Sequence, residues 1–224
     1  MRRWLRENSL TLAFTLLLLG ALAGQAVSGQ AFYNENAQDA GLPTLTLLEY
    51  VTSSQFTVDV AENWQSEYLQ FLLYILFTVW LLQKGSPESK SLDEAGRESD
   101  EDQKVGRYAE DSSPRWARVG GWRTALYSRS LGLVMGVIFL GSWSAQLVAG
   151  RSAYNAEQLQ DLQEPLGWTG YLTAPDFWNR TLQNWQSEFL AVGSMVDLSI
   201  YLRERGSPES KPVGSAHTAT GVEG

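Results

Sequence analysis

The apolar residues of the chain are gathered into runs that carry few or no charges. Four such runs stand out, at residues 10–27, 68–83, 130–150 and, less strongly, 189–202. The last run contains Asp197 and reaches membrane length only if its helix begins near Leu182. Since a helix of about 18 residues is roughly 27 Å long, runs of this length nearly cross the hydrocarbon core of a bilayer. The pattern predicts an all-α, polytopic membrane protein with four transmembrane helices, at about 9–29, 61–83, 130–150 and 182–202.

The first apolar run also has features of a cleaved signal peptide. Arg2, Arg3 and Arg6 form a basic segment before it, and the small residues around Val27 resemble a cleavage site. The internal repeat described next favours a retained helix, because the first run matches an interior run of the chain beyond the supposed cleavage site.

The chain consists of two copies of one sequence unit. A shift of 121 residues aligns NWQSE at 63–67 with NWQSE at 184–188, and GSPESK at 85–90 with GSPESK at 206–211, without a gap. Each copy contains two of the predicted spans, so both copies enter the membrane in the same orientation. We therefore expect two parallel helical hairpins related by a pseudo-twofold axis along the membrane normal.

The repeat divides the chain into four parts. We expect a first copy at 1–90, a flexible charged cytoplasmic linker at 91–121, a second copy at 122–211 and a disordered tail at 212–224. The linker is rich in Ser, Gly, Glu and Asp with interleaved charges, which is typical of a solvated tether. Docking of a partner on this linker is the alternative.

The positions of the basic residues predict the orientation. Of the 17 lysines and arginines, all except Arg151 and Arg180 lie outside the two predicted outer loops. By the positive-inside rule, both termini and the central linker are cytoplasmic. Since the outer loops are acidic, most of the formal net charge of −8 lies on the outer face. We expect the protein in the cytoplasmic (inner) membrane as a multi-pass protein.

The NWQSE motif is the most specific candidate site. Asn63 and Glu67 share one helical face, as do Asn184 and Glu188, and a carboxylate at membrane depth needs a partner or a function. Two explanations remain open. The polar side chains hold neighbouring helices together at the wet interface, or the paired glutamates bind a cation or share a proton.

Five further residues belong to this candidate polar site or border it. Gln25 and Gln146 are expected at the same depth as the motif, and Asp197 is a separate ion-site candidate whose repeat counterpart is Leu76. Trp64 and Trp185 are expected to anchor the helices at the headgroup level.

Small residues recur at four-residue spacing in the first and third spans. Gly20 and Gly24 correspond to Gly141 and Ala145 across the repeat. Because small side chains let helix backbones approach closely in lipid, helix packing is the expected role, with a pore lining as the alternative. At the second span, Asp59 and Glu62 resemble a capping box that would start the helix.

The residues of the chain do not support several classes of catalytic or metal-binding site. The chain has no cysteine and one histidine, and it contains no nucleophile and base pair, phosphate-binding loop or zinc spacing. We therefore expect no metal, no cofactor and no enzymatic activity, and the acidic balance argues against nucleic acid as a partner.

The stretches RRWLRENSL, AENWQSEYLQFLLY, KGSPESK, SPRWARVGGWRTALYS and TLQNWQSEFLAVGSM resemble a family of bacterial, mainly actinobacterial, four-helix integral membrane proteins. The resemblance covers essentially the whole chain. The family is classified as a domain of unknown function, so the resemblance implies a location and an architecture and no activity.

Two functional hypotheses follow. The first is a non-enzymatic structural or partner-binding membrane component, embedded in the lipid bilayer and assembled with a second copy of itself or another membrane protein. The alternative is a small ion or proton transporter or channel that uses the repeated NWQSE glutamates.

Overall fold

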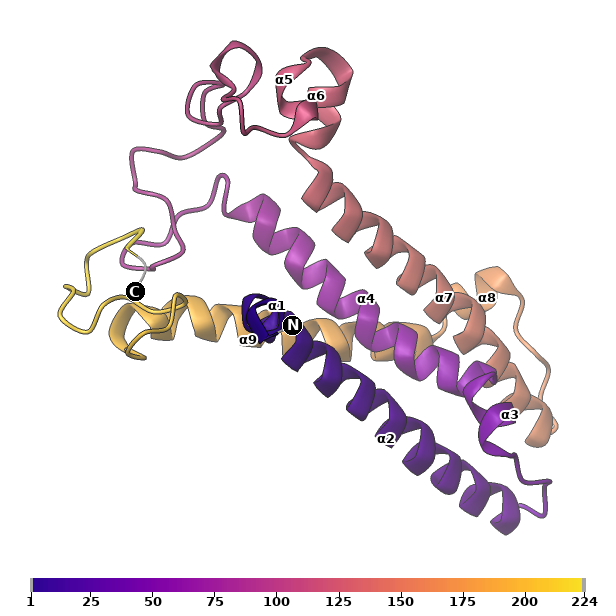
Figure 1. The fold of residues 1–224 in the computed structure, drawn as a ribbon. Coiled ribbons are helices and arrows are strands. Elements are labelled where there is room, and N and C mark those ends of the chain that lie inside the picture. Colours follow the sequence, from indigo (N-terminus) through magenta and orange to yellow (C-terminus); the bar gives the residue numbers. More distant parts are fainter. Residues whose placement is uncertain (1, 223–224) are drawn as a thin grey trace. The chain divides into compact units, whose positions relative to one another are not determined.

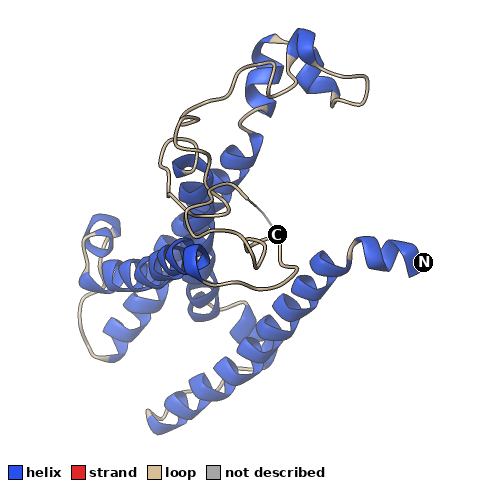
Figure 2. Ribbon diagram, turned by 90° about the vertical axis from the view of Figure 1, so that its left-hand side faces the viewer, coloured by secondary structure: helices blue, strands red, loops and turns tan. Residues whose placement is uncertain are grey.

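The computed structural model describes residues 2–222 of the chain. This part is built from helices and loops, without a β-strand (Figures 1 and 2). The predicted all-α class is therefore confirmed.

Four long helices dominate the fold (Figure 1). They are α2 (Ser9–Asp39), α4 (Ser54–Phe77), α7 (Ser130–Gln160) and α9 (Pro175–Tyr201). The short helices are α1 (Arg2–Glu7), α3 (Leu47–Val51), η1 (Gly106–Tyr108), α5 (Arg115–Arg118), α6 (Gly121–Tyr127) and α8 (Trp168–Leu172). Among the described helices, α2 and α7 are long and apolar enough to cross a membrane, judged by length and composition.

The helices α2 and α7 continue about ten residues beyond the expected ends of the first and third spans, so the loops that follow them are shorter than the sequence suggested. Nothing stops the helix at residue 29 or 150, because no proline follows before Pro43 or Pro165. The extra turns are polar, which suits a helix that leaves an apolar environment and enters water.

Both helices end in the same hydrogen-bonded turn. After α2, the N–H of Leu42 donates to the carbonyl of Ala37 at 2.7 Å, and Gly41 has a φ of 69°. After α7, the N–H of Gln163 donates to the carbonyl of Gln158 at 2.7 Å, and Leu162 has a φ of 56°. This is the Schellman arrangement, in which a left-handed residue directs the chain off the helix. The second copy places a leucine where the first has glycine.

The start of α4 differs from the prediction. The helix begins at Ser54, and the hydroxyl of Ser53 accepts the N–H of Phe56 at 3.2 Å. Asp59 and Glu62 therefore lie inside the helix, and the capping box expected there is wrong. The structure forms a capping box at Thr46 and Glu49 instead, at the start of α3.

The described chain divides into two compact units. The first comprises the residues up to Ala61 together with Ala145–Leu172, and the second comprises Glu62–Ser144 together with the chain from Thr173 onward. The helices α4 and α7 each contribute to both units.

A tyrosine packed against a glycine appears in both copies within the first unit. The hydroxyl of Tyr50 lies against Gly29, and the hydroxyl of the fully buried Tyr171 lies against Gly150. A Cβ added at either glycine would overlap the hydroxyl oxygen. Both glycines therefore provide the room that the tyrosine needs to cross the preceding long helix.

An asparagine binds the loop that follows each of α2 and α7 back to its helix. The side-chain amide of Asn34 donates to the carbonyl of Leu45 at 2.9 Å, and its oxygen accepts the N–H of Leu45 at 2.7 Å. Asn155 makes the same two bonds with Leu166, at 3.0 and 2.8 Å. The 121-residue sequence repeat is thus matched by repeated side-chain contacts.

Candidate functional site

The two NWQSE motifs lie on α4 and α9 and belong to the second compact unit. In the first copy, Gln65 and Ser66 have exposed fractions of 0% and 1%. Asn63, Trp64 and Glu67 of the same motif are exposed. The buried side chains are therefore the central Gln65 and Ser66 of the motif, and Gln65 points away from the face that positions 63 and 67 share on the helix.

Buried side chains of the first motif contact the second motif directly. The indole N–H of Trp185 donates to the side-chain oxygen of Gln65 at 2.7 Å. The hydroxyl of Ser66 lies 3.5 Å from a carboxylate oxygen of Glu188, a longer and weaker contact. The amide of Gln65 also donates to the carbonyl of Glu62 at 3.0 Å. The first two contacts join the two repeat copies through side chains at different positions of the same motif.

An ion pair links the same two helices one turn closer to their N-termini. A guanidinium nitrogen of Arg180 lies 3.1 Å from the carboxylate of Glu62, and another lies 3.3 Å from that of Asp176. The counterparts of Arg180 and Glu62 across the repeat are Asp59 and Gln183, so the pair has no symmetric equivalent. Sequence reasoning used Arg180 only to assign sidedness and missed this role.

Aromatic rings surround the contact between the motifs. Trp143 of α7 packs against Phe177, Trp178 and Trp185 of α9, with ring centroids 6.1, 6.2 and 5.9 Å apart. Trp143 also approaches the hydroxyl of the fully buried Thr181 at 3.4 Å. Trp185 is thus half-buried and hydrogen-bonded, whereas its repeat counterpart Trp64 is 43% exposed.

The structure also locates the glutamates of the candidate ion site. Glu67 is exposed and Glu188 is half-buried, and they lie close enough for their charges to repel. The side-chain amide of Asn184 donates to the carbonyl of Arg180 at 2.8 Å, a contact within its own helix. Asp197 is exposed on α9.

The remaining predicted residues lie elsewhere. Gln25 and Gln146 belong to the first unit, where Gln25 is half-buried and Gln146 is fully buried. A Cβ at Gly20, Gly24 or Gly141 would meet no atom within 4 Å, and Ala145 is half-buried. The packing role of this small-residue stripe stays a prediction. Within residues 2–222, no group of three or more metal-ligating side chains is placed to hold an ion.

A family model described as a domain of unknown function, DUF6766, matches residues 1–222. The chain belongs to the DUF6766 family. This confirms the resemblance to a family of unknown function. Searches of curated proteins and of solved structures return no match.

The second repeated motif of this DUF6766 chain, GSPESK, closes a loop after each of α4 and α9. The hydroxyl of Ser89 accepts the N–H of Gln83 at 3.0 Å, and the hydroxyl of Ser210 accepts the N–H of Glu204 at 2.9 Å. These two pairs are equivalent in the repeat. The sequence marks the motif only as a sign of duplication, and the structure shows it as a loop-closing element.

The lysines that end the two GSPESK motifs are used differently in this DUF6766 chain. Lys90 forms an ion pair with Glu98 at 2.8 Å. Lys211 is 1% exposed and donates to the carbonyls of Gly85 at 2.6 Å and His217 at 2.9 Å. Carbonyl oxygens thus solvate the buried ammonium in place of water.

Residues 212–222 lie against the first GSPESK motif within the second unit. The hydroxyl of Thr220 accepts the N–H of Gly85 at 2.9 Å, and the N–H of Gly221 donates to the carbonyl of Ser86 at 3.0 Å. A guanidinium nitrogen of Arg203 donates to the carbonyl of Ser215 at 3.0 Å. The C-terminal segment therefore braces the loop that follows α4.

Proposed function

We propose that this protein is a multi-pass protein of the cytoplasmic membrane in which α2, α4, α7 and α9 all cross the bilayer as two parallel hairpins. The helices α2 and α7 have the required length and hydropathy. With 24 and 27 residues, α4 and α9 are about 36 and 40 Å long, enough to reach across a bilayer. The distribution of lysine and arginine supports cytoplasmic termini and a cytoplasmic linker.

Within this architecture, we propose a non-enzymatic function as a structural or partner-binding component of the membrane. The observation that carries the proposal is the hydrogen bond from Trp185 to Gln65. It shows that buried polar groups of the two NWQSE motifs are satisfied by one another. A catalytic or transport site would direct such groups toward a substrate path, whereas Gln65 and Trp185 are directed toward each other.

The outer and central segments offer surface for a partner. Leu162 is 95% exposed on the outer loop of the second copy, and Trp122 is 68% exposed before α7. Large exposed apolar side chains beside charged segments are common where proteins meet membranes or other proteins. The proposed partners are the lipid bilayer and a second copy of this chain or another membrane protein.

Proton or cation transport is a second candidate, favoured by one observation. Glu67 and Glu188 come from the same position of the two motifs and lie close enough to repel each other. Two carboxylates in this relationship can share a proton or a cation. In this hypothesis, the Gln65 and Trp185 pair holds the two glutamates in place.

Proteoliposome flux measurements separate the two candidates. The structural hypothesis predicts proton and alkali-cation fluxes equal to those of protein-free liposomes, with no change on Glu67→Gln or Glu188→Gln. A flux above that of empty liposomes that disappears in the Glu67→Gln, Glu188→Gln double variant would replace the structural proposal with transport. Asp161→Asn, at an exposed position after α7, is the matched control for an acidic residue outside the candidate site.

Crosslinking in cells tests whether the protein binds a partner. A photoreactive amino acid at position 162 or 122 is expected to form a defined adduct with a second copy of the chain or a membrane protein, identified by mass spectrometry. The yield of the adduct should fall in the Gln65→Leu variant. It should stay the same in the Gln186→Leu variant, which alters the equivalent but exposed glutamine. The absence of any adduct at both positions would contradict a partner-binding role.

A further inference from the structure

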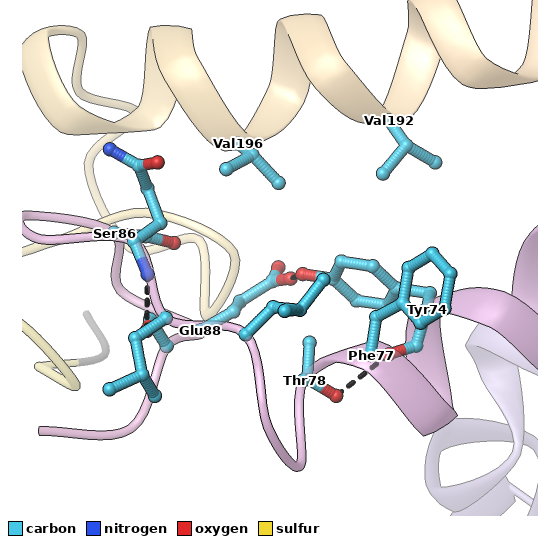
Figure 3. A pocket seen from close by; sticks show the side chains of 11 residues that line it. Tyr74, Phe77, Thr78, Ser86, Glu88, Val192 and Val196 are labelled. Atoms are coloured by element: carbon cyan, nitrogen blue, oxygen red, sulfur yellow. Dashed lines mark hydrogen bonds between the residues drawn. The ribbon is translucent and has the colours of Figure 1, made fainter. Parts of the chain in front are cut away.

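A cavity in the second unit lies between the C-terminal part of α4, the loop that follows it and α9 (Figure 3). Its volume is about 210 Å³. The apolar lining comes from Phe77, Leu81 and Leu82 on one side and from Val192 and Val196 of α9 on the other. In Figure 3 the two valines point from α9 toward the side chains of the first copy.

The polar lining of the cavity is contributed by the first copy. Glu88 of GSPESK points to the hydroxyl of Tyr74, which donates a hydrogen bond to its carboxylate (Figure 3). Within the described residues, Glu88 forms no ion pair, and Tyr74 is its hydrogen-bond partner. The negative charge of Glu209, the repeat counterpart of Glu88, also acts on this hydroxyl. The carboxylate of Glu88 therefore makes this end of the cavity negative.

An unpaired carboxylate beside an apolar cavity has an energetic consequence. Partial burial removes water from the carboxylate, and a cation with hydrogen-bond donors restores the lost interactions. The lysines of the two motifs do not fill this role, since Lys90 pairs with Glu98 and Lys211 donates to backbone carbonyls. Within residues 2–222, Lys84 forms no ion pair with Glu88 either. The cavity therefore has a charge that an external cation can satisfy.

The lining also restricts the chemical class of that cation. Hard metal ions take six or more oxygen ligands, whereas most of the surface that lines this cavity is apolar. The ring of Phe77 and the ring of Tyr74 offer faces that attract organic cations. Because a cavity of about 150 Å³ can hold benzene, one of this size has room for a phenyl ring with a short chain.

We propose that this cavity is a binding site for a small primary organic ammonium ion, with the ammonium group on Glu88 and the apolar body between α4 and α9. The hydroxyl of Tyr74 orients the carboxylate and supplies a further acceptor for the ammonium. The counterpart of Tyr74 in the second copy is Met195, so the site belongs to the first copy and is not duplicated.

The test uses the full-length protein in detergent and 2-phenylethylammonium as the probe. Calorimetry or ligand-observed NMR, with empty micelles subtracted, is expected to show saturable binding to the unmodified chain. Glu88→Gln keeps the size of the side chain and removes its charge, so it should weaken binding by about tenfold or more, as expected for loss of a charged hydrogen bond. The uncharged probe 2-phenylethanol should bind both proteins equally.

Two further variants keep the test decisive if Glu88→Gln alters the loop. Val196→Phe fills the cavity from α9 without touching the carboxylate and should also abolish saturable binding. Glu94→Gln, in the exposed linker, is the matched control and should bind like the unmodified chain. The proposal would be overturned if the unmodified chain shows no saturable binding, or if the Glu88→Gln and Val196→Phe variants bind the probe as tightly as the unmodified chain.

Discussion

The indole nitrogen of Trp185 donates a hydrogen bond of 2.7 Å to the side-chain oxygen of Gln65, and these residues come from the two copies of the same pentapeptide. The duplicated motif contacts itself, but with different positions from each copy. Gln65 is fully buried, whereas its counterpart Gln186 is exposed. A sequence repeat has thus been turned into an asymmetric contact between α4 and α9.

This asymmetry predicts unequal effects of the same substitution in the two copies. Gln65→Leu removes the acceptor of the Trp185 N–H and should lower the free energy of unfolding by about 1–3 kcal/mol. Gln186→Leu should change it by less than about 0.5 kcal/mol, as is usual for exposed positions. Thermal unfolding in detergent measures both. Equal destabilisation by the two variants would contradict the observed contact.

A double-mutant cycle isolates the hydrogen bond from the loss of packing. Trp185→Phe alone should cost stability, and the Gln65→Leu, Trp185→Phe double variant should cost less than the sum of the two single variants. Trp64→Phe, at the exposed counterpart, should show no coupling to Gln65→Leu.

The contact between Gly150 and Tyr171 predicts a steric effect. In Gly150→Ala, the new methyl group would overlap the Tyr171 hydroxyl and lie 3.1 Å from Val58, so stability should fall by about 1–3 kcal/mol. Adding Tyr171→Phe should restore part of the loss, since it removes the overlapping oxygen. Gly193→Ala is the control, because a Cβ there meets no atom within 4 Å. A neutral Gly150→Ala variant would show that the tyrosine does not pack there.

The left-handed Leu162 predicts a stabilising substitution. Its φ of 56° strains a residue that has a Cβ, and its side chain is 95% exposed, so little packing is lost with it. Leu162→Gly should raise stability by about 0.5–1 kcal/mol, and Gly41→Leu at the equivalent turn should lower it by a similar amount. The melting temperatures of the two variants should move in opposite directions. A shift of both in the same direction would argue against a shared turn geometry.

The capping box of α3 predicts a pH dependence in the first outer loop. The backbone N–H of Thr46 and its hydroxyl donate to Glu49 at 2.7 and 2.8 Å, and these bonds lower the pKa of Glu49 below its ordinary value of 4.5. A lowered folded-state pKa means that the stabilisation is fully present above that ordinary value and is lost as the pH falls through the lowered one. Hydrogen exchange of α3 should accelerate over this acidic interval, after correction for the intrinsic exchange rate.

Substitution of Thr46 tests whether its hydrogen bonds lower the pKa of Glu49. Thr46→Val should move the pKa of Glu49 toward its ordinary value, measured by NMR titration of the carboxyl group. Thr44→Val, at an exposed threonine nearby, should leave the titration unchanged. Because Thr46→Val keeps the backbone N–H, which lowers the pKa of Glu49 most, a Glu49 titration that stays the same in both variants would rule out only the Thr46 hydroxyl as a source of the shift.

The sequence predicted those parts of the structure that depend on local pattern. The apolar runs predicted the positions of the four long helices. The 121-residue repeat was found in the sequence, and the structure adds the equivalent contacts of Asn34 and Asn155, because equal local sequences adopt equal backbone geometry. The ends of the helices were harder to predict from the sequence. The start of α4 depends on the hydroxyl of Ser53, and the sequence offered a competing acidic pattern at Asp59 and Glu62.

The polar contact between the copies could not be predicted for a different reason. The two motifs have identical letters, so nothing within the motif distinguishes Gln65 from Gln186 or Trp64 from Trp185. The members that become buried lie beside residues outside the motif that differ between the copies or come from another helix, such as Trp143 and the ion pair between Arg180 and Glu62. Tertiary packing breaks the symmetry that the duplication established.

The proposal of four spans with cytoplasmic termini is tested most directly by cysteine labelling, because the chain contains no cysteine of its own. Ser112→Cys in the central linker and Gln163→Cys in the second outer loop both introduce the thiol at an exposed position. In intact cells with a permeable outer envelope, a membrane-impermeant maleimide should label the Gln163→Cys variant at once and the Ser112→Cys variant only after the inner membrane is opened. Labelling of the Ser112→Cys variant in intact cells, or protection of the Gln163→Cys variant, would contradict the proposed topology.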